Sequence, residues 1–254
     1  MRTWFSRHPV WFMAFYTVFY LSVFHWLEVH VTVPDVWVHC RLDDLIPFCK
    51  YAIVPYVAWF FWIPFTLFYL LRKAPRADFW RLCIPLFAGM TFALVCYLVL
   101  PTGLYLRPYR VYGNDVFAKA VRLLYAADTP TSVCPSIHVF NSVTLWLAYY
   151  RCRIFEEPRR RWMRPAATVL CVSILLATVL LKQHSCIDVM MGILLALILD
   201  TAMAARERDA RRLPQRLCFS DAKSACSHDG TGRFFCVKTD LRANRYLLWV
   251  LYPY

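Results

Sequence analysis

The run YAIVPYVAWFFWIPFTLFYLL, from Tyr51 to Leu71, decides the fold because it carries no charged residue over the full length of a membrane span. A helix needs about 20 consecutive apolar residues to cross the hydrocarbon core of a bilayer. Pro55 and Pro64 interrupt the run, but membrane helices tolerate proline where neighbouring helices satisfy the freed carbonyl groups. We therefore expect a transmembrane helix at this position.

Apolar runs of similar character recur on both sides of this segment. We expect further spans at Val10–Leu27, Leu82–Leu100, Ser136–Tyr150, Pro165–Leu181 and Ile187–Ala204, of which Ser136–Tyr150 is short. The chain is 60% hydrophobic and only 18% charged, a composition that argues against a soluble domain. The predicted fold class is all-α integral membrane, a six-transmembrane-helix bundle.

The positions of the basic residues predict the orientation of the bundle. The net charge is +13, and most Arg and Lys residues lie in short segments beside apolar runs, where they favour the cytoplasmic side and meet anionic lipid. The segments that alternate with these are poorer in basic residues. The basic segments contain Arg2, Arg7, Arg72, Lys73, Arg76, Arg81, Arg151, Arg153, Arg159, Arg160, Arg161, Arg164, Arg206, Arg208, Arg211 and Arg212.

We therefore expect a multi-pass protein of the cell membrane with both termini in the cytoplasm. No nucleic-acid motif accompanies the positive charge, so the expected partners are membrane lipids and no nucleic acid. The predicted domains are a membrane domain over residues 1–205 and a basic cytoplasmic tail over residues 206–254.

The long loop from Pro101 to Pro135 is an exception to the charge pattern. It carries Arg107, Arg110, Lys119 and Arg122 on the predicted outer face. Binding of an anionic substrate would explain these cations. The alternative is that long loops cross the membrane regardless of their charge.

Two histidines on the predicted outer face have partners at helical spacing. His184 and Asp188 are four residues apart, so the carboxylate can accept a hydrogen bond from one imidazole nitrogen and leave the other free as a nucleophile or base. Ser136 stands where a helix N-cap is expected, and the exposed N–H groups of a helix start bind phosphate well. His138 lies in the same first turn, placed to donate a proton to a leaving oxygen.

These residues give the chain a resemblance to a known family. Arg107-Pro108, Pro135-Ser136-Ile137-His138 and His184-x3-Asp188 resemble the motifs K-x6-R-P, P-S-G-H and S-R-x5-H-x3-D of the type 2 phosphatidic acid phosphatase superfamily. The resemblance covers about residues 80 to 200. It implies a six-helix bundle with the motifs facing the non-cytoplasmic side of the membrane.

The resemblance also implies roles for single residues. His184 would attack phosphorus and form a phosphohistidine, Asp188 would orient it, and His138 would protonate the leaving group and then activate water or an alcohol. Three residues would bind the phosphate oxygens, namely Arg107, Ser136 and Lys182. The chemistry implied by the family needs no metal and no cofactor.

The chain departs from the family pattern at three places. Leu100 stands where the first motif has lysine, Ile137 replaces the glycine, and Ala177-Thr178 replace Ser-Arg. Lys182 lies one helical turn beyond Thr178 and could supply the missing cation, and Arg110 or Lys119 could replace the first lysine. Variants of this form look closest to the branch that includes inositol phosphorylceramide synthases.

The cysteines leave several alternatives open. Cys40 could pair with Cys49, and Cys134 with Cys186, in an oxidising compartment; otherwise all four are free thiols. The tail residues Cys218, Cys226, His228 and Cys236 suggest a zinc site, but their spacing is not that of a known finger. A tail that lies on the membrane surface is the alternative.

The leading functional prediction is a membrane phosphatase that hydrolyses a lipid phosphate or diphosphate through a phosphohistidine intermediate. The first alternative is a lipid phosphotransferase, in which an alcohol takes the phosphoryl group in place of water. A third possibility is a channel or transporter whose His and Asp residues relay protons. It offers no reason for the Pro-Ser-x-His helix start.

Overall fold

The structure is a computed structural model that describes residues 8–224 and places side chains as far as residue 209. It is predominantly helical, with almost no sheet. Its helices are α2 (Pro9–His30), α3 (Arg41–Leu45), η1 (Lys50–Ala52), α4 (Ile53–Lys73), α5 (Arg76–Val99), α6 (Val116–Ala127), α7 (Ile137–Arg151), η2 (Arg153–Glu156), α8 (Met163–Leu180) and α9 (Cys186–Ser224), and its strands are β1 (Val36–Trp37) and β2 (Thr102–Gly103).

The chain divides into two compact units, residues 1–200 and residues 201–254. The first unit holds α2 to α8 and the first part of α9, and it contains every residue predicted to form the site. The described part of the second unit is the rest of α9, to Ser224. The predicted boundary between residues 205 and 206 falls inside α9, and the cysteines proposed for a tail zinc site lie outside the residues with described side chains.

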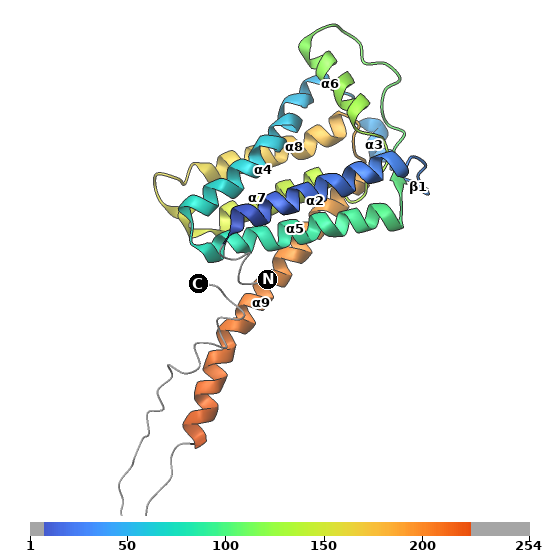
Figure 1. The fold of residues 1–254 in the computed structure, drawn as a ribbon. Helices are drawn as coiled ribbons and strands as arrows, with labels where there is room; N and C mark the ends of the chain where they lie inside the picture. Colours follow the sequence, from blue (N-terminus) through green and yellow to red (C-terminus); the bar gives the residue numbers. More distant parts are fainter. Residues whose placement is uncertain (1–7, 225–254) are drawn as a thin grey trace, which may run out of the picture. The chain divides into compact units, whose positions relative to one another are not determined.

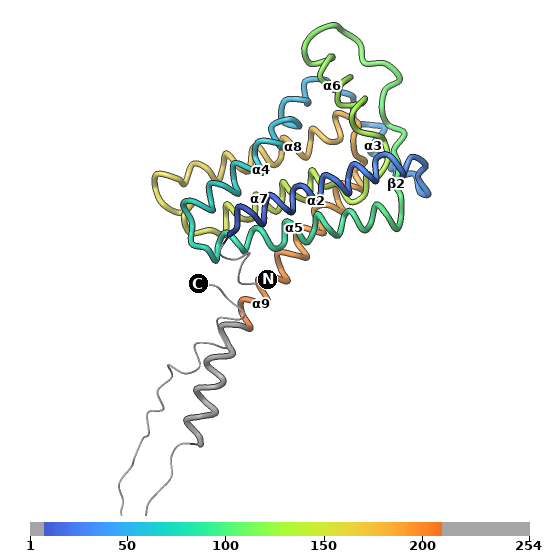
Figure 2. Tube along the Cα trace, in the orientation of Figure 1, coloured from blue at the N-terminus to red at the C-terminus, as the bar shows by residue number. Residues whose placement is uncertain are grey.

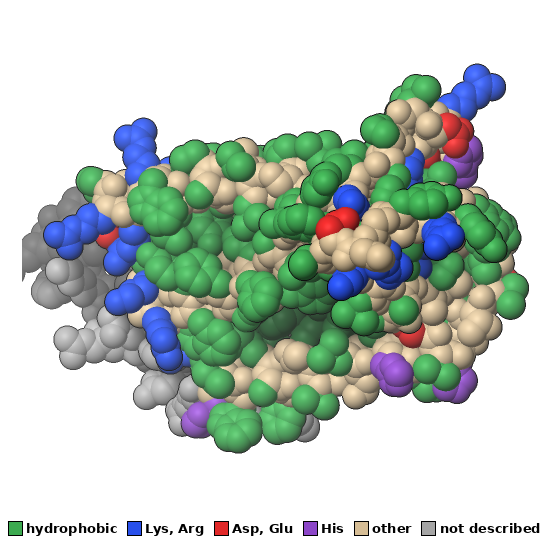
Figure 3. All heavy atoms as spheres, turned by 90° about the horizontal axis from the view of Figure 1, so that it is seen from above, with side chains coloured by type: hydrophobic (Ala, Val, Ile, Leu, Met, Phe, Trp, Pro, Cys, Tyr) green, Lys and Arg blue, Asp and Glu red, His purple; other side chains and the backbone are tan. Residues whose placement is uncertain are grey.

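Within residues 8–224, five helical segments are long and apolar enough to cross a membrane: Pro9–His30, Lys50–Lys73, Arg76–Val99, Met163–Leu180 and Cys186–Asp209. Many large apolar side chains on these helices are exposed, among them Phe15, Phe61, Phe92, Val169 and Met190. In Figure 3 such side chains cover the middle of the visible face, whereas Lys and Arg gather toward its ends. These features fit a multi-pass membrane protein.

The short helix α7 is the exception among the six predicted spans. It has 15 residues, which at a rise of about 1.5 Å per residue is about 22 Å, less than the roughly 30 Å of a bilayer core. Its residues are buried nearly all round, including Phe140, Asn141 and Leu145. Such a helix is the centre of a bundle, and α4, α5 and α8 pack around it (Figure 1).

Two glycines bring neighbouring helices unusually close to α7. A Cβ atom at Gly89 of α5 would lie 2.0 Å from the Phe140 ring, and one at Gly192 of α9 would lie 2.8 Å from the Ser136 carbonyl oxygen. Only glycine allows so close an approach. The contact at Gly192 fixes the start of α9 against the start of α7, where the predicted catalytic residues lie.

The loops at one end of the bundle contain structure that the sequence patterns did not reveal. β1 pairs with β2 in parallel, and Gly103 also bridges Thr131. The 12-residue helix α6 lies in the predicted outer loop, capped by Asp115, which accepts a hydrogen bond from the Ala118 backbone. α3, α6 and the two strands all lie at this end (Figure 2), and the basic α4–α5 and α7–α8 connections lie at the opposite end.

Candidate active site

Ser136 begins the helix that carries the first predicted catalytic histidine. α7 starts at Ile137, and the Ser136 hydroxyl accepts a hydrogen bond from the Val139 backbone N–H at 3.4 Å. This confirms the predicted N-cap. The Ser136 backbone N–H donates to the Asp188 carbonyl oxygen at 3.3 Å, so the start of α7 is bonded to the first turn of α9.

His138 is enclosed by aromatic side chains of α4. Its ring stacks on Tyr56 with 4.4 Å between ring centroids and lies 4.3 Å from the Trp59 ring. Its Nε2 atom is buried and has no hydrogen-bond partner among the described residues. A buried polar atom without a hydrogen-bond partner lowers the stability of the folded protein, so its presence points to a functional use of the atom.

His184 lies next to His138, with 5.7 Å between the two ring centroids. His184 Nδ1 is 3.5 Å from Asp188 Oδ2, which is longer than an ordinary N–H···O hydrogen bond. The same Oδ2 accepts a hydrogen bond from the Ser185 backbone N–H at 2.9 Å. Asp188 is fully buried, and its other oxygen has no hydrogen-bond partner among the described residues. The four-residue spacing thus places the carboxylate beside one nitrogen of the His184 ring, but the predicted hydrogen bond is not formed, and His184 Nδ1 has no hydrogen-bond partner among the described residues.

Arg107 joins the loop after α5 to the segment that precedes His184. Its guanidinium donates to the carbonyl oxygens of Asp128 at 2.7 Å and Thr129 at 3.2 Å, and to the Gln183 side-chain oxygen at 2.5 Å. It also lies over the Tyr125 ring, 4.8 Å from the centroid. Its Nε atom and the Gln183 Nε2 atom are buried and without hydrogen-bond partners among the described residues.

The Asp128 carboxyl lies beside this guanidinium, with 3.9 Å between Oδ2 and the nearest Arg107 nitrogen. Burial and the neighbouring Glu28 carboxylate raise the pKa of Asp128 to about 6, although Arg107 and His184 act in the opposite direction. Glu28 in turn accepts hydrogen bonds from the backbone and hydroxyl of Thr129. The hydrogen-bond acceptors of Arg107 are neutral groups. Its positive charge is therefore not cancelled by a close carboxylate and can attract an anion.

Lys182 is held by carbonyl oxygens of α3 and of the residue that follows it. Its ammonium donates to the carbonyl oxygens of Asp43 and Ile46, each at 2.6 Å, and its φ of 54° lies in the left-handed region. The residue is 8% exposed. Two of the three ammonium donors thus fix the segment that carries His184, and a role of Lys182 in phosphate binding stays a prediction.

Asp43 is a buried residue beside the candidate site that the sequence did not predict. This residue of α3 is 1% exposed and accepts hydrogen bonds from the Ser185 hydroxyl at 2.6 Å and from the backbone N–H groups of Cys186 and Cys40, each at 2.8 Å. Burial raises the pKa of Asp43, but these hydrogen bonds outweigh it and leave the pKa below its ordinary value. No motif or residue spacing around Asp43 predicts that it binds the segment after His184.

The two other cations considered for the first motif lie on the exposed loop. Arg110 lies over the Tyr112 ring, 5.7 Å from the centroid, and Lys119 is exposed on α6. Arg122 donates to the carbonyl oxygens of Val111 and Gly113. Of the basic residues in this loop, Arg107 is thus the one hydrogen-bonded to the His184 segment.

Of the alternatives left open for the cysteines, the structure has the free thiols: Cys40, Cys49, Cys134 and Cys186 are all free. The physical reason is that Cys186, at the start of α9, faces α3. There its Sγ atom lies within 4.8 Å of the Cys40 sulfur and of a carboxylate oxygen of Asp43.

Comparison with protein families agrees with this geometry. A family model of the PAP2 superfamily matches residues 104–212, a stretch that contains all six predicted site residues. Residues 104–212 are thus similar to the PAP2 superfamily, in agreement with the resemblance seen in the motifs. The superfamily consists of phosphatases and phosphotransferases that act on phosphate esters. No curated protein and no solved structure was found to match the chain.

Proposed function

We propose that the protein is a membrane phosphatase that hydrolyses a lipid phosphate or diphosphate through a phosphohistidine on His184. The observation that carries the proposal is the pair of neighbouring imidazoles, His138 and His184, 5.7 Å apart between ring centroids. One phosphoryl group can contact two rings at this separation. Members of the PAP2 superfamily act on phosphorylated lipids, and the exposed apolar helices favour a substrate that arrives from the membrane.

The contacts of the two rings support the roles that we propose for them. Asp188 lies on the Nδ1 side of His184, which leaves Nε2 to attack phosphorus. As the bond from phosphorus to the leaving oxygen breaks, His138 gives that oxygen a proton. His138 then takes a proton from water, and the resulting hydroxide attacks the phosphohistidine, releases phosphate and restores His184.

The phosphate oxygens would be bound by groups that surround this pair. Arg107 supplies a guanidinium whose Nε is unpartnered among the described residues, and Gln183 supplies an amide Nε2 in the same state. The N-terminus of α7 behind Ser136 adds backbone N–H groups and the positive end of the helix dipole. We include Lys182 as a further cation of the same segment. These donors would stabilise the charge that develops on phosphorus oxygens in the transition state.

We further propose that α7 completes a six-span bundle, with both termini in the cytoplasm and the active site on the outer face of the cell membrane. In this arrangement residues 1–205 form the membrane domain and residues 206–254 a cytoplasmic tail. The support is the charge asymmetry of the connections. In cells carrying Tyr109→Cys or Arg159→Cys, a membrane-impermeant maleimide should label the first above the wild-type background and not the second. The reverse pattern would show that the orientation is wrong.

A lipid phosphotransferase similar to inositol phosphorylceramide synthases is the second candidate. The burial of the site favours it: His184 is 7% exposed, Asp188 and Ser136 are fully buried, and His138 is enclosed by Tyr56 and Trp59. Limited access of water would give an alcohol acceptor the advantage in the second step. A transferase should release little phosphate until an acceptor alcohol is added.

The decisive experiment measures phosphate release from a panel of lipid phosphates by the full-length protein in detergent. The wild type is compared with His184→Ala and with His25→Ala, which changes an exposed histidine of α2. Release by the wild type and by His25→Ala, with loss in His184→Ala, supports the phosphatase. Release that needs an added alcohol supports the transferase. Wild-type turnover by a correctly inserted His184→Ala protein would refute both.

A further inference from the structure

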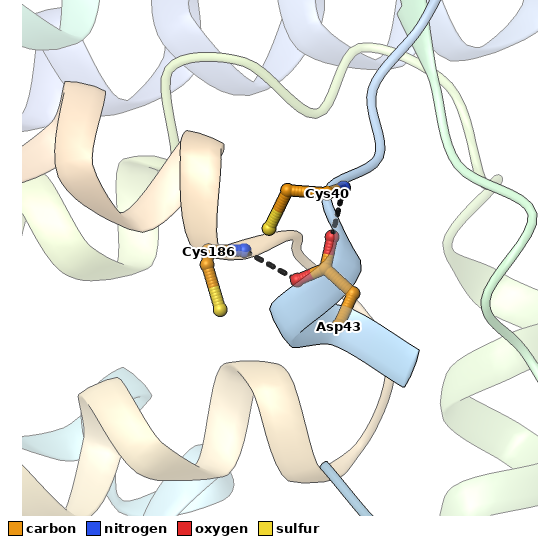
Figure 4. A group of neighbouring side chains, drawn as sticks. All are labelled: Cys40, Asp43 and Cys186. Carbon is orange, nitrogen blue, oxygen red and sulfur yellow. Dashed lines mark hydrogen bonds between the residues drawn. The ribbon is translucent and has the colours of Figure 1, made fainter. Parts of the chain in front are cut away.

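Cys40, Asp43 and Cys186 meet where α3 touches the start of α9. The two sulfur atoms and a carboxylate oxygen all lie within 4.8 Å of one another (Figure 4). Cys40 immediately precedes α3, and Cys186 is the first residue of α9. Both cysteines are free and partly exposed, so soluble reagents can reach them.

Asp43 holds the two cysteines against each other. One of its carboxylate oxygens accepts a hydrogen bond from the Cys40 backbone N–H, and the other accepts one from the Cys186 backbone N–H, each at 2.8 Å. Figure 4 shows these two bonds converging on the same carboxylate from two separate segments. The backbones that carry the two thiols are therefore fixed in position before any bond forms between the sulfurs.

We propose that Cys40 and Cys186 form a disulfide that ties α3 to the segment carrying His184. Two S–H groups lose two protons and two electrons and gain one S–S bond. The electrons pass to a disulfide oxidant, either a small molecule such as oxidised glutathione or an oxidised protein dithiol, which is reduced to two thiols. Small side-chain rotations must bring the sulfurs to a separation of about 2 Å.

The bond would reinforce contacts that already join the same two segments. Lys182 donates to two carbonyl oxygens, one in α3 and one in the residue that follows it, and the Ser185 hydroxyl donates to Asp43. Ser185 also contacts Asp188, the partner of His184. A disulfide here would fix the loop that positions the nucleophile, and it would close a long loop of chain, which favours stabilisation.

A metal ion bound by the same three residues is the competing use of the cluster. The hydrogen bonding of Asp43 argues against it, because its two oxygens already accept three hydrogen bonds, from Cys40, Ser185 and Cys186. A metal would have to compete with these donors for the carboxylate lone pairs. Zinc would also need both thiols ionised beside that carboxylate.

The test is peptide mapping of the full-length protein in detergent after treatment with oxidised glutathione and alkylation of the remaining thiols. We expect a peptide pair joined through Cys40 and Cys186, two hydrogens lighter than the separate peptides. It should persist in Cys49→Ser and Cys134→Ser and disappear in Cys40→Ser. Oxidation should raise the unfolding temperature of the wild type and of Cys49→Ser, and leave that of Cys40→Ser unchanged.

Three results would overturn the proposal. Cys40 and Cys186 could both be alkylated after oxidation, either could be joined to another cysteine, or zinc could co-purify in equal amount and block alkylation until a chelator removes it. Because mapping needs no turnover, its outcome is independent of the phosphatase proposal. A mapped disulfide in a protein without phosphate release would leave this inference standing.

Discussion

Exchanging Asp43 for asparagine tests whether α3 positions the segment that carries the proposed nucleophile, His184. The carboxylate accepts three hydrogen bonds: one oxygen binds the Cys186 N–H, and the other binds both the Cys40 N–H and the Ser185 hydroxyl. Asparagine keeps one oxygen and replaces the other with an NH₂ group, which can only donate. The amide can be turned so that its oxygen keeps two of the three hydrogen bonds. Its NH₂ group then faces the Cys186 N–H, and the third hydrogen bond is lost because both groups are donors.

The loss in the free energy of unfolding follows from the hydrogen bond that the substitution removes. A hydrogen bond to a charged acceptor contributes about 1.5–3 kcal/mol, and a buried donor left without a partner costs about 1–3 kcal/mol more. Asp43→Asn should therefore lower the free energy of unfolding by about 3–5 kcal/mol. For a chain of this size each kcal/mol corresponds to roughly 2–4 °C, so the unfolding temperature should fall by about 6–20 °C.

The matched control is Asp44→Asn, which changes the next residue of the same short helix. Its side chain is 62% exposed and pairs with His39. Thermal unfolding by intrinsic fluorescence in detergent should leave Asp44→Asn within about 0.5 kcal/mol of the wild type. Phosphate release below the unfolding temperature should fall in Asp43→Asn alone, because His184 loses part of its support. If the two variants unfold and turn over alike, the positioning role of α3 is wrong.

Three further predictions concern the rest of the site. Arg107→Lys loses the planar set of donors and should lower kcat/KM about 10- to 100-fold, while Arg110→Lys should match the wild type in the same phosphate-release assay. Gly192→Val forces a side chain against the Ser136 carbonyl oxygen, 2.8 Å from the Cβ position; thermal unfolding should show a loss of about 1–3 kcal/mol, and wild-type stability would contradict the close approach. Burial raises the pKa of Asp128 to about 6, above the ordinary carboxyl pKa, so its contribution to stability is present at low pH and is lost as pH rises through about 6. Between roughly pH 4 and 7 the wild type should thus lose about 2 kcal/mol relative to Asp128→Asn, and parallel unfolding curves for the two proteins across this range would show that the pKa of the Asp128 carboxyl is not raised.

The sequence predicted the apolar helices well because bilayer length and hydrophobicity constrain them strongly. The bounds of the predicted Tyr51–Leu71 and Pro165–Leu181 spans lie within two residues of those of the helical segments Lys50–Lys73 and Met163–Leu180. The sequence was less decisive for α7, which contains buried polar residues such as Asn141. Its composition is typical neither of a lipid-facing span nor of a soluble amphipathic helix. Burial against other helices, which no local pattern records, explains its composition.

The loops were predicted poorly for a different physical reason. α6 is a short helix with one face on the bundle, and β1 and β2 pair over only two residues each. Such elements are stabilised by their surroundings rather than by their own propensity. The contacts of Asp43 likewise join segments 142 residues apart in the chain, so no spacing rule could have found them.

The residues with predicted chemical roles were easier to find because their chemistry restricts residue type and spacing. The His184–Asp188 interval places a carboxylate beside an imidazole on any helix, and a serine before a helix start is a cap wherever it occurs. The structure brings both to one place with His138. Spacing could not predict that the Lys182 ammonium donates to the carbonyl oxygens of Asp43 and Ile46, because those acceptors are backbone atoms that every residue has.

The charge balance around Arg107 follows from the same contacts and bears on substrate binding. A close carboxylate partner would cancel the guanidinium charge, but its hydrogen bonds go to two carbonyl oxygens and an amide. The nearest carboxyl oxygen, on Asp128, is 3.9 Å away, and burial raises the pKa of that residue to about 6. An arriving phosphate would raise this pKa further, because two anions close together favour protonation of one of them. If Arg107 binds phosphate as we propose, Asp128 would therefore take up a proton when substrate binds and would not repel the phosphate.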